Sequence, residues 1–255
     1  MRQRHILAFS ATFAVLLTGT QPAVAGSVHI NDMGANTSIA RPGAPKNIVG
    51  LKRLTHTITL NTGAKTYGLR YLAAFDDKRP GVSVIGEGYI GMPVPSGCNW
   101  YAGGFFDVVI NGKTIGTTPV HSFFGRSTGN RGQVDFVFDA PQGLVRVRFV
   151  AQAGDDVLHC QVLLEPKVEI TKLRILLRCY PSAFISTAER HVLTPTRDLK
   201  QGDHAELDSA KEDWLLYYDP KIDAGQVFGN RTGVGPCAVL WPRGNPQKVH
   251  FGVAS

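Results

Sequence analysis

The stretch that decides the fold is Gln133–Tyr180, which reads QVDFVFDAPQGLVRVRFVAQAGDDVLHCQVLLEPKVEITKLRILLRCY. Polar and apolar residues alternate along it, which is typical of strands with one solvent-exposed face and one face buried in the core. Three breaks containing Pro or Gly divide it into strands that hairpin loops would join. The expected antiparallel strands are Gln133–Asp139, Leu144–Val150, Val157–Leu164 and Glu169–Cys179.

Folding the chain back at each loop predicts which residues of the four strands lie opposite one another. The predicted apolar row is Phe136, Val147, Cys160 and Leu173. The predicted polar row, on the other face, is Asp135, Arg148, His159 and Arg174. A slip of one residue would bury these charges, so odd slips are excluded, whereas a slip of two residues stays open.

The first 25 residues have the features of a secretory signal peptide. Arg2 and Arg4 precede the apolar stretch Ile6–Leu17, and a small-x-small site ends at Ala25. The apolar stretch is shorter than the ~20 residues that a membrane span needs. We therefore expect cleavage after Ala25, a secreted or periplasmic protein, and no transmembrane segment in the mature chain.

The formal charge of the whole chain is +7. A modest excess of basic residues in an exported protein favours acidic surfaces or acidic glycans as partners. The Arg and Lys residues are spread along the chain, whereas nucleic-acid binding calls for a clustered basic stripe with aromatic platforms. No nucleic-acid partner is therefore expected.

An oxidising compartment would allow the four cysteines, Cys98, Cys160, Cys179 and Cys237, to pair. The predicted register separates Cys160 from Cys179 by about 20 Å, too far for a disulfide. We expect Cys160 to be a small buried apolar residue. Cys and His spacing does not suit a structural zinc site, so no metal site is predicted.

The rest of the chain also predicts β-structure. Gly26–Pro45 is expected to be a flexible leader that is mobile unless a sheet edge captures it, and residues 46–255 are expected to form a single domain. Asn111-Gly112 predicts a two-residue hairpin with a primed turn. Further expected strands are Lys46–Val49, His56–Leu60, Tyr67–Phe75, Val82–Ile90, Phe106–Ile110, Lys113–Gly116, Trp214–Tyr218, Cys237–Trp241 and Lys248–Val253. The sequence thus predicts an all-β protein, a large antiparallel β-sandwich.

Three motifs invite a catalytic or ligand-binding interpretation. Gly125–Gly129 matches G-x-S-x-G, but a strand follows it where a nucleophile elbow needs a helix, so a loop is expected. Gly229–Gly235 lacks the Lys-Ser or Lys-Thr of a phosphate loop. The acidic segment Asp203–Asp213 is either a solvated connection or, less in keeping with its spacing, a calcium site. No cofactor is predicted.

The strand pattern, with Trp214-Leu215-Leu216-Tyr217-Tyr218-Asp219 and Gly235-Pro236-Cys237-Ala238-Val239-Leu240-Trp241, resembles the galactose-mutarotase-like β-supersandwich of bacterial carbohydrate proteins. The resemblance extends over about residues 46–253 and rests on strand pattern and a few aromatic residues. It implies a curved sheet whose concave face meets sugar. The His, His and Glu set of the mutarotases has no clear counterpart in this chain.

These observations leave three hypotheses. The first is carbohydrate binding on the polar sheet face, where Arg forks suit uronic carboxylates and exposed aromatic rings stack on sugars. The second is a carbohydrate-active enzyme with His159 as acid or base. The third is a structural or assembly domain of the cell envelope, in which the charged row is a wet sheet face and the tryptophans are core. The candidate ligand-binding residues are Asp135, Arg148, His159, Arg174, Trp100, Tyr101 and Trp241.

Overall fold

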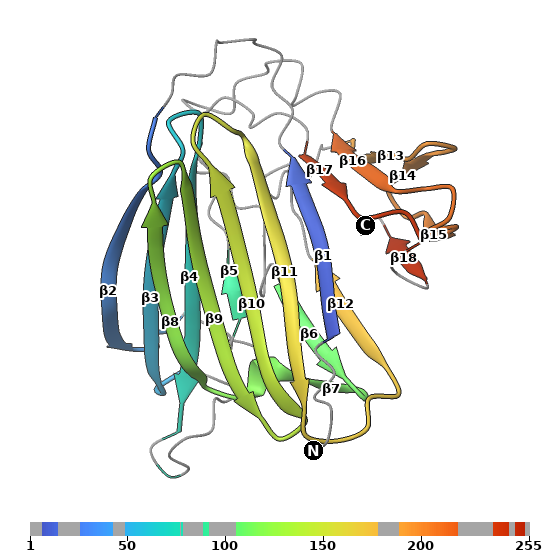
Figure 1. Cartoon of the computed structure of the whole chain (residues 1–255). Coiled ribbons are helices and arrows are strands. Elements are labelled where there is room, and N and C mark those ends of the chain that lie inside the picture. Colours follow the sequence, from blue (N-terminus) through green and yellow to red (C-terminus); the bar gives the residue numbers. More distant parts are fainter. Residues whose placement is uncertain are drawn as a thin grey trace, which may run out of the picture.

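The described part of the chain folds almost entirely into antiparallel β-strands (Figure 1). The computed structural model describes residues 7–14, 26–42, 49–76, 78, 89–91, 106–177, 189–218, 237–244 and 248–252. Two large sheets pack face to face, which confirms the predicted all-β, sandwich-like class. No helix among these residues is long and apolar enough to cross a membrane.

The front layer in Figure 1 is a nine-stranded sheet. Its spatial order is β14 (Asp198–Lys200), β13 (His191–Leu193), β16 (Trp214–Tyr218), β17 (Cys237–Leu240), β1 (Leu7–Ala14), β11 (Val157–Pro166), β10 (Gly143–Gln152), β9 (Arg131–Ala140) and β8 (Val120–Thr128).

The second layer is a seven-stranded sheet. Its order is β12 (Leu173–Leu177), β6 (Phe106–Ile110), β5 (Tyr89–Gly91), β4 (Thr66–Phe75), β3 (Lys52–Asn61) and β2 (His29–Ile39), with β7 (Lys113–Thr114) paired to β6. A 3-10 turn, η1 (Ile115–Thr117), links β7 to β8, and β15 (His204–Leu207) pairs with β18 (Val249–Gly252) apart from both layers.

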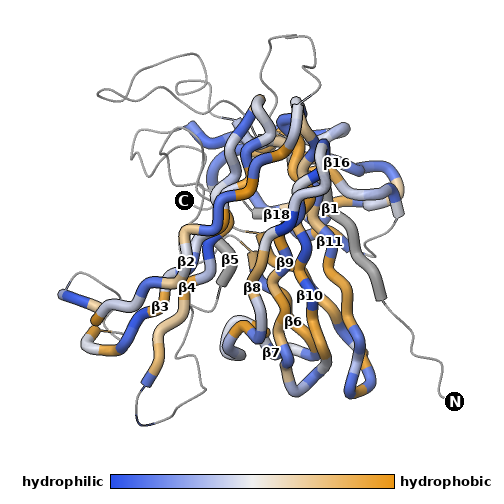
Figure 2. Tube along the Cα trace, turned by 60° about the vertical axis from the view of Figure 1, so that its left-hand side comes forward, coloured by the Kyte–Doolittle hydropathy of each residue, from blue (hydrophilic) through white to orange (hydrophobic). Residues whose placement is uncertain are grey.

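One hydrophobic core lies between the two large sheets. The inward residues of β9 and β10 are fully buried, and Phe149 of β10 meets Phe106 of β6 edge to face at 5.8 Å between ring centres. Phe136 packs against Phe149 at 6.0 Å. Figure 2 shows hydrophobic residues recurring along β6, β9 and β10 where the sheets face each other. The period-two pattern therefore positions the outward residues of β8–β11 as well.

The predicted register is confirmed between β9 and β10 and is off by two residues between β10 and β11. Phe136 lies opposite Val147 as expected, but Val147 lies opposite Val162, and Cys160 lies opposite Phe149. The faces of both strands are unchanged, because a slip of two keeps the alternation. Cys160 is buried and free, as the sequence predicts.

Contacts outside the two strands explain the slip. In the β10–β11 loop, the Gly154 amide donates to the Thr62 carbonyl at 2.7 Å, and the Thr62 hydroxyl donates to the Asp155 carbonyl at 2.7 Å. The Tyr67 hydroxyl donates to the Asp156 carbonyl. The β3–β4 hairpin thus holds the loop, and this tertiary contact is invisible to a reflection of the chain about the loop.

The fourth predicted strand belongs to the other sheet, which corrects the sequence prediction. β12 pairs with β6, so Leu173 lies opposite Ile110 and not opposite Cys160. Asn111 anchors the crossing chain: its amide oxygen accepts from the amides of Thr171 and Lys172 at 3.0 and 3.1 Å. Its amide nitrogen donates to the Glu169 carbonyl at 2.8 Å.

Asn111 also sits in the predicted primed turn, with φ of +49° beside Gly112 at +83°, which confirms the hairpin. We expect Asn111→Gly to lower the free energy of unfolding by about 1–3 kcal/mol, because the amides of Thr171 and Lys172 lose their acceptor. Asn111→Ala should be less stable still, since alanine resists positive φ. Urea titration of both variants tests this, and an alanine variant as stable as the wild type would contradict it.

Residues 29–39 of the predicted flexible leader are captured by a sheet edge, the alternative that the prediction left open. These residues form β2, which pairs along β3 at the edge of the seven-stranded sheet and lies beside β8. The Val28 amide donates to the Gly129 carbonyl at 2.9 Å, and the Ser127 hydroxyl donates to the Val28 carbonyl at 2.7 Å. The G-x-S-x-G stretch is therefore part of a strand and its turn, and Ser127 serves a structural contact.

Candidate functional site

The polar outer face of the nine-stranded sheet is built around Asp135 of β9, which is completely buried. Its carboxylate accepts from Arg148 Nε at 2.9 Å and Arg148 Nη2 at 3.2 Å. It also accepts from Arg146 Nη1 at 3.3 Å and Gln133 Nε2 at 2.8 Å. The carboxylate is hidden beneath the side chains that it orients.

Both arginines keep donors for a ligand. Among the described residues, Arg148 bonds through Nε and Nη2 only, and Arg146 through Nη1 only. The side chains are 18% and 36% exposed, respectively. Arg126, exposed on β8, donates to Gln133 Oε1 at 3.4 Å. Two guanidinium groups bond to the Asp135 carboxylate, and a third, that of Arg126, lies beside them on Gln133, so this cluster carries a net positive charge that favours an anionic ligand.

The face is accessible in the described part of the molecule. Figure 1 shows no described strand lying in front of β8–β11. Most residues that point outward from β10 and β11 are half-buried or exposed, but Val150 is 5% exposed, and the outward Gln133, Asp135 and Val137 of β9 are buried. A ligand would therefore reach this face at the half-buried side chains of Arg146 and Arg148 and at the exposed Asp139.

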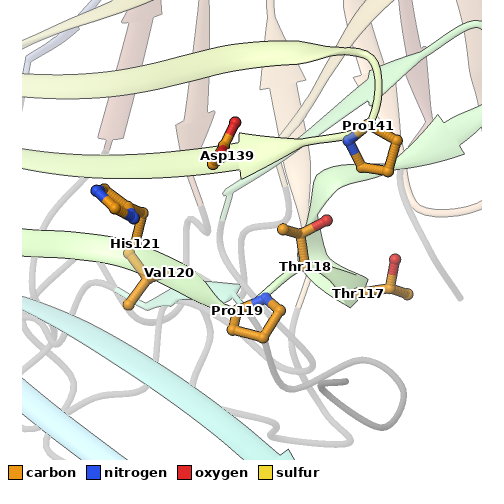
Figure 3. A pocket seen from close by; sticks show the side chains of 7 residues that line it. All are labelled: Thr117, Thr118, Pro119, Val120, His121, Asp139 and Pro141. Carbon is orange, nitrogen blue, oxygen red and sulfur yellow. The ribbon is translucent and has the colours of Figure 1, made fainter. Parts of the chain in front are cut away.

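A shallow pocket of about 540 Å³ lies at one end of the same face. The Thr114 hydroxyl caps η1 by accepting from the Gly116 amide at 3.0 Å, and buried Ile115 anchors the turn in the core. A β-bulge between Val120 and Ser122 then interrupts the pairing of β8 with β9 beside His121. The pocket is lined by Thr117, Thr118, Pro119, Val120, His121, Asp139 and Pro141 (Figure 3).

The pocket combines polar groups with the saturated rings of two prolines. Figure 3 shows His121 and Asp139 on neighbouring strands, with Pro119 and Pro141 nearby. Asp139 is paired with Lys167, whose ammonium group holds the pKa of that carboxyl below its usual value. The carboxylate is thus ionised at neutral pH and can accept hydrogen bonds from ligand hydroxyls. The pocket therefore offers hydrogen-bonding groups and two apolar rings to a ligand.

The pocket and the arginines are neighbours on the sheet. Arg146 lies opposite Val137, and Asp139 is two residues further along β9 on the same face. Two residues of a strand span about 7 Å. One extended ligand could therefore contact both Arg146 and the pocket.

His159 and Arg174 differ from the predicted polar row. His159 lies opposite Val150 and Thr12, and Gln161 takes the place opposite Arg148. Arg174 lies on β12 opposite Val109, on the other sheet, and is exposed. Asp135 and Arg148 are in contact, and His159 lies on the same face one alternate position further along because the β10–β11 register is shifted; Arg174 alone of the four is on the other sheet, because β12 crosses to the second layer.

The predicted aromatic stacking residues find no support in the described residues. Trp241 is 7% exposed and belongs to the core, which corrects its assignment to a sugar site. Trp100 and Tyr101 lie outside the described residues, as do Cys98 and Cys179.

Three described histidines lie within ion-pair distance of carboxylates. His56 Nε2 lies 2.6 Å from Asp32 Oδ1, and His191 Nδ1 lies 3.2 Å from Asp198 Oδ1. The third, His250, has its Nδ1 3.6 Å from Glu206 Oε2. The His56 contact lowers the pKa of Asp32. Such pairs can hold or transfer a proton, but none of the three contributes to the pocket lining.

The acidic segment Asp203–Asp213 contains a structural carboxylate, Glu212, which is buried. It accepts from the hydroxyls of Thr194 and Thr196 at 2.8 and 2.5 Å and from Arg197 Nη2 at 3.0 Å. It also accepts from the Asp208 amide at 3.0 Å. Burial raises the pKa of Glu212, but these donors outweigh it and hold the pKa below the ordinary 4.5.

We expect Glu212→Gln to lower the free energy of unfolding at pH 7 by about 1–2 kcal/mol, because a charged acceptor of four donors becomes neutral. A lowered folded-state pKa gives stabilisation that is complete above the unfolded value near 4.5 and is lost as the pH falls through the folded value. The difference between wild type and variant should therefore shrink on acidification below pH 4.5. Urea titrations between pH 3.5 and 7 check this, and a difference that does not change with pH would contradict it.

The alternation that places Arg148 on the outer face also places Arg146 there, but the predicted ligand-binding residues did not include Arg146, His121, Asp139 or Lys167. Every second residue of β9 and β10 points outward, so the alternation in the sequence could have placed Asp135, Arg146 and Asp139 on one face. The bulge and the 3-10 turn that form the pocket have no comparable signal in the sequence.

Comparisons with models of protein families, with curated proteins and with solved structures find no match to this chain. The resemblance to the galactose-mutarotase-like β-supersandwich therefore stays a prediction. The segments that suggested it form β16 and β17, which are adjacent, with Trp214 opposite Leu240.

Proposed function

We propose that this chain is an exported β-sandwich protein that binds acidic carbohydrate on the outer face of its nine-stranded sheet. The observation that supports this most is the pair of guanidinium groups held over the buried carboxylate of Asp135. Their geometry is fixed before a ligand arrives, so little side-chain entropy is lost on binding. Planar forks with unused donors suit the carboxylate of a uronic acid.

The pocket at the end of β9 supports the choice of a sugar over a simple anion. Asp139, His121 and two threonines offer acceptors and donors for ring hydroxyls, and the proline rings offer apolar contact. The pocket lies about 7 Å along the strand from the position of Arg146, so an oligouronate bound at Arg146 and running along the strand would reach it. We propose an oligouronate of at least two residues as the ligand class.

A glycan array tests the proposal, with wild type, Arg146→Gln and Arg174→Gln as probes. Arg146→Gln removes a half-exposed guanidinium that makes one long bond to Asp135, so the fold should tolerate it. Arg174→Gln is the matched control, because it removes the same charge from the other sheet. We expect the wild type and the control to bind acidic glycans and Arg146→Gln to lose most of that signal. Equal binding by all three proteins, or binding of neutral glycans alone, would refute the proposal.

A further inference from the structure

Strand β1 occupies the interior of the nine-stranded sheet. Its eight residues pair with Val157–Leu164 of β11, and Thr12–Ala14 pair with Ala238–Leu240 of β17. Figure 1 shows β1, in dark blue, between yellow β11 and red β17. All of β1 lies within Met1–Ala25, the segment with the features of a cleaved signal peptide.

We propose that export, by removing β1, opens a slot one strand wide between β11 and β17, and that an extended segment of a partner protein fills it. This inference rests on the export that the proposed function includes, and it is independent of the carbohydrate site. Cleavage after Ala25 would leave one edge of β11 unpaired over Val157–Leu164, while its other edge stays paired with β10. Unpaired strand edges are templates for the addition of another strand.

The buried side of β11 argues against an empty slot. Leu158, Cys160, Val162 and Leu164 are at most 2% exposed and belong to the shared core. Without a neighbouring strand, part of this apolar surface would meet water, at a cost of about 25 cal/mol for each Å². The structure thus favours an occupied slot over an open one.

The register defines the chemistry of the occupant. Four alternate positions of β1 lie opposite the buried residues of β11, and Ala11, the small one, lies opposite Cys160. The other four lie opposite half-buried residues on the outer face, including His159 and Gln161. No residue of β11 that pairs with β1, and none of β17, is a carboxylate or an amine. The occupant is therefore an uncharged strand of about eight residues, apolar at every second position and small at the one that faces Cys160.

The test uses the full chain, expressed with its own N-terminal segment in a secreting host and collected after export. Mass spectrometry should find Gly26 as the first residue. The probe is a synthetic peptide of residues 7–14 carrying Ala11→Cys, activated as a mixed disulfide with thionitrobenzoate. The Cys160 thiolate should displace thionitrobenzoate and form a one-to-one adduct, since directly opposed antiparallel residues lie within disulfide range.

Two controls make the readout specific for the register. A peptide with Thr12→Cys places the sulfur opposite His159, on the other face, and should react at least tenfold more slowly. The Cys160→Ala protein should give no adduct with the Ala11→Cys peptide.

The proposal fails if the exported protein retains residues 1–25, if no adduct forms with Cys160, or if both peptides react equally well. If the exported protein is a dimer and forms no adduct with the peptide, a second copy of the chain fills the slot. That result also overturns the proposal of a separate partner protein. Loss of glycan binding on Arg146→Gln leaves these outcomes unaffected, so the two proposals can fail separately.

Discussion

Replacing Asp135 with alanine should lower the free energy of unfolding by about 3–5 kcal/mol, the range for breaking a buried ion pair by removing one partner. The carboxylate is fully buried and accepts four hydrogen bonds, three of them from guanidinium groups. Without it, the Arg146 and Arg148 guanidinium groups lie side by side with no charge between them. Urea titration measures the loss.

Asp139→Ala is the matched control for this prediction. Asp139 lies on the same strand and the same face and is also paired with a cation, but its side chain is 56% exposed. Exposed ion pairs contribute little to stability. We expect Asp139→Ala to unfold at nearly the wild-type urea concentration, and equal losses in the two variants would contradict the role given to Asp135.

Gly132→Val should cost about 3 kcal/mol, the upper end of the usual range for overpacking. A Cβ at Gly132 would lie 2.4 Å from Val28 Cγ1 and 2.7 Å from Leu60 Cδ2, so side chains at the edge of the second sheet occupy the space. Gly132→Ala should cost less, because it adds one carbon where valine adds three. Urea titration of both variants provides the measurement.

A double-mutant cycle identifies the cause of the Gly132 effect. Val28→Ala removes the nearest clashing atoms, so it should recover part of the stability lost in Gly132→Ala. Additive losses would show that the close approach of Val28 to β9 is not the source of the strain.

The sequence determines faces and hairpins better than it determines partners. The alternation of polar and apolar residues predicts that Asp135, Arg146 and Arg148 point outward. The Asn111-Gly112 pair predicts its own turn. Both patterns are local in the sequence. The two-residue slip between β10 and β11 depends on Thr62, far away along the chain. The transfer of β12 to the other sheet depends on contacts made by Asn111. Neither interaction leaves a periodic pattern.

The candidate site shows the same limit. The Asp135–Arg148 contact was predictable from an undisturbed hairpin, since the two residues lie opposite each other. His159 and Arg174 were misplaced because their positions required the partners of β11 and β12. Trp241 has an aromatic ring of the kind that stacks on sugars, but it is buried in the hydrophobic core.

The most direct test of the carbohydrate proposal is calorimetric titration of oligogalacturonate into the exported protein and into Arg146→Gln, with Arg174→Gln as control. Removing one preorganised guanidinium from a charged pair should weaken binding at least tenfold, which corresponds to about 1.4 kcal/mol. The control should bind within twofold of the wild type. Unchanged affinity in Arg146→Gln, or an equal loss in Arg174→Gln, would contradict an acidic-carbohydrate site on this face.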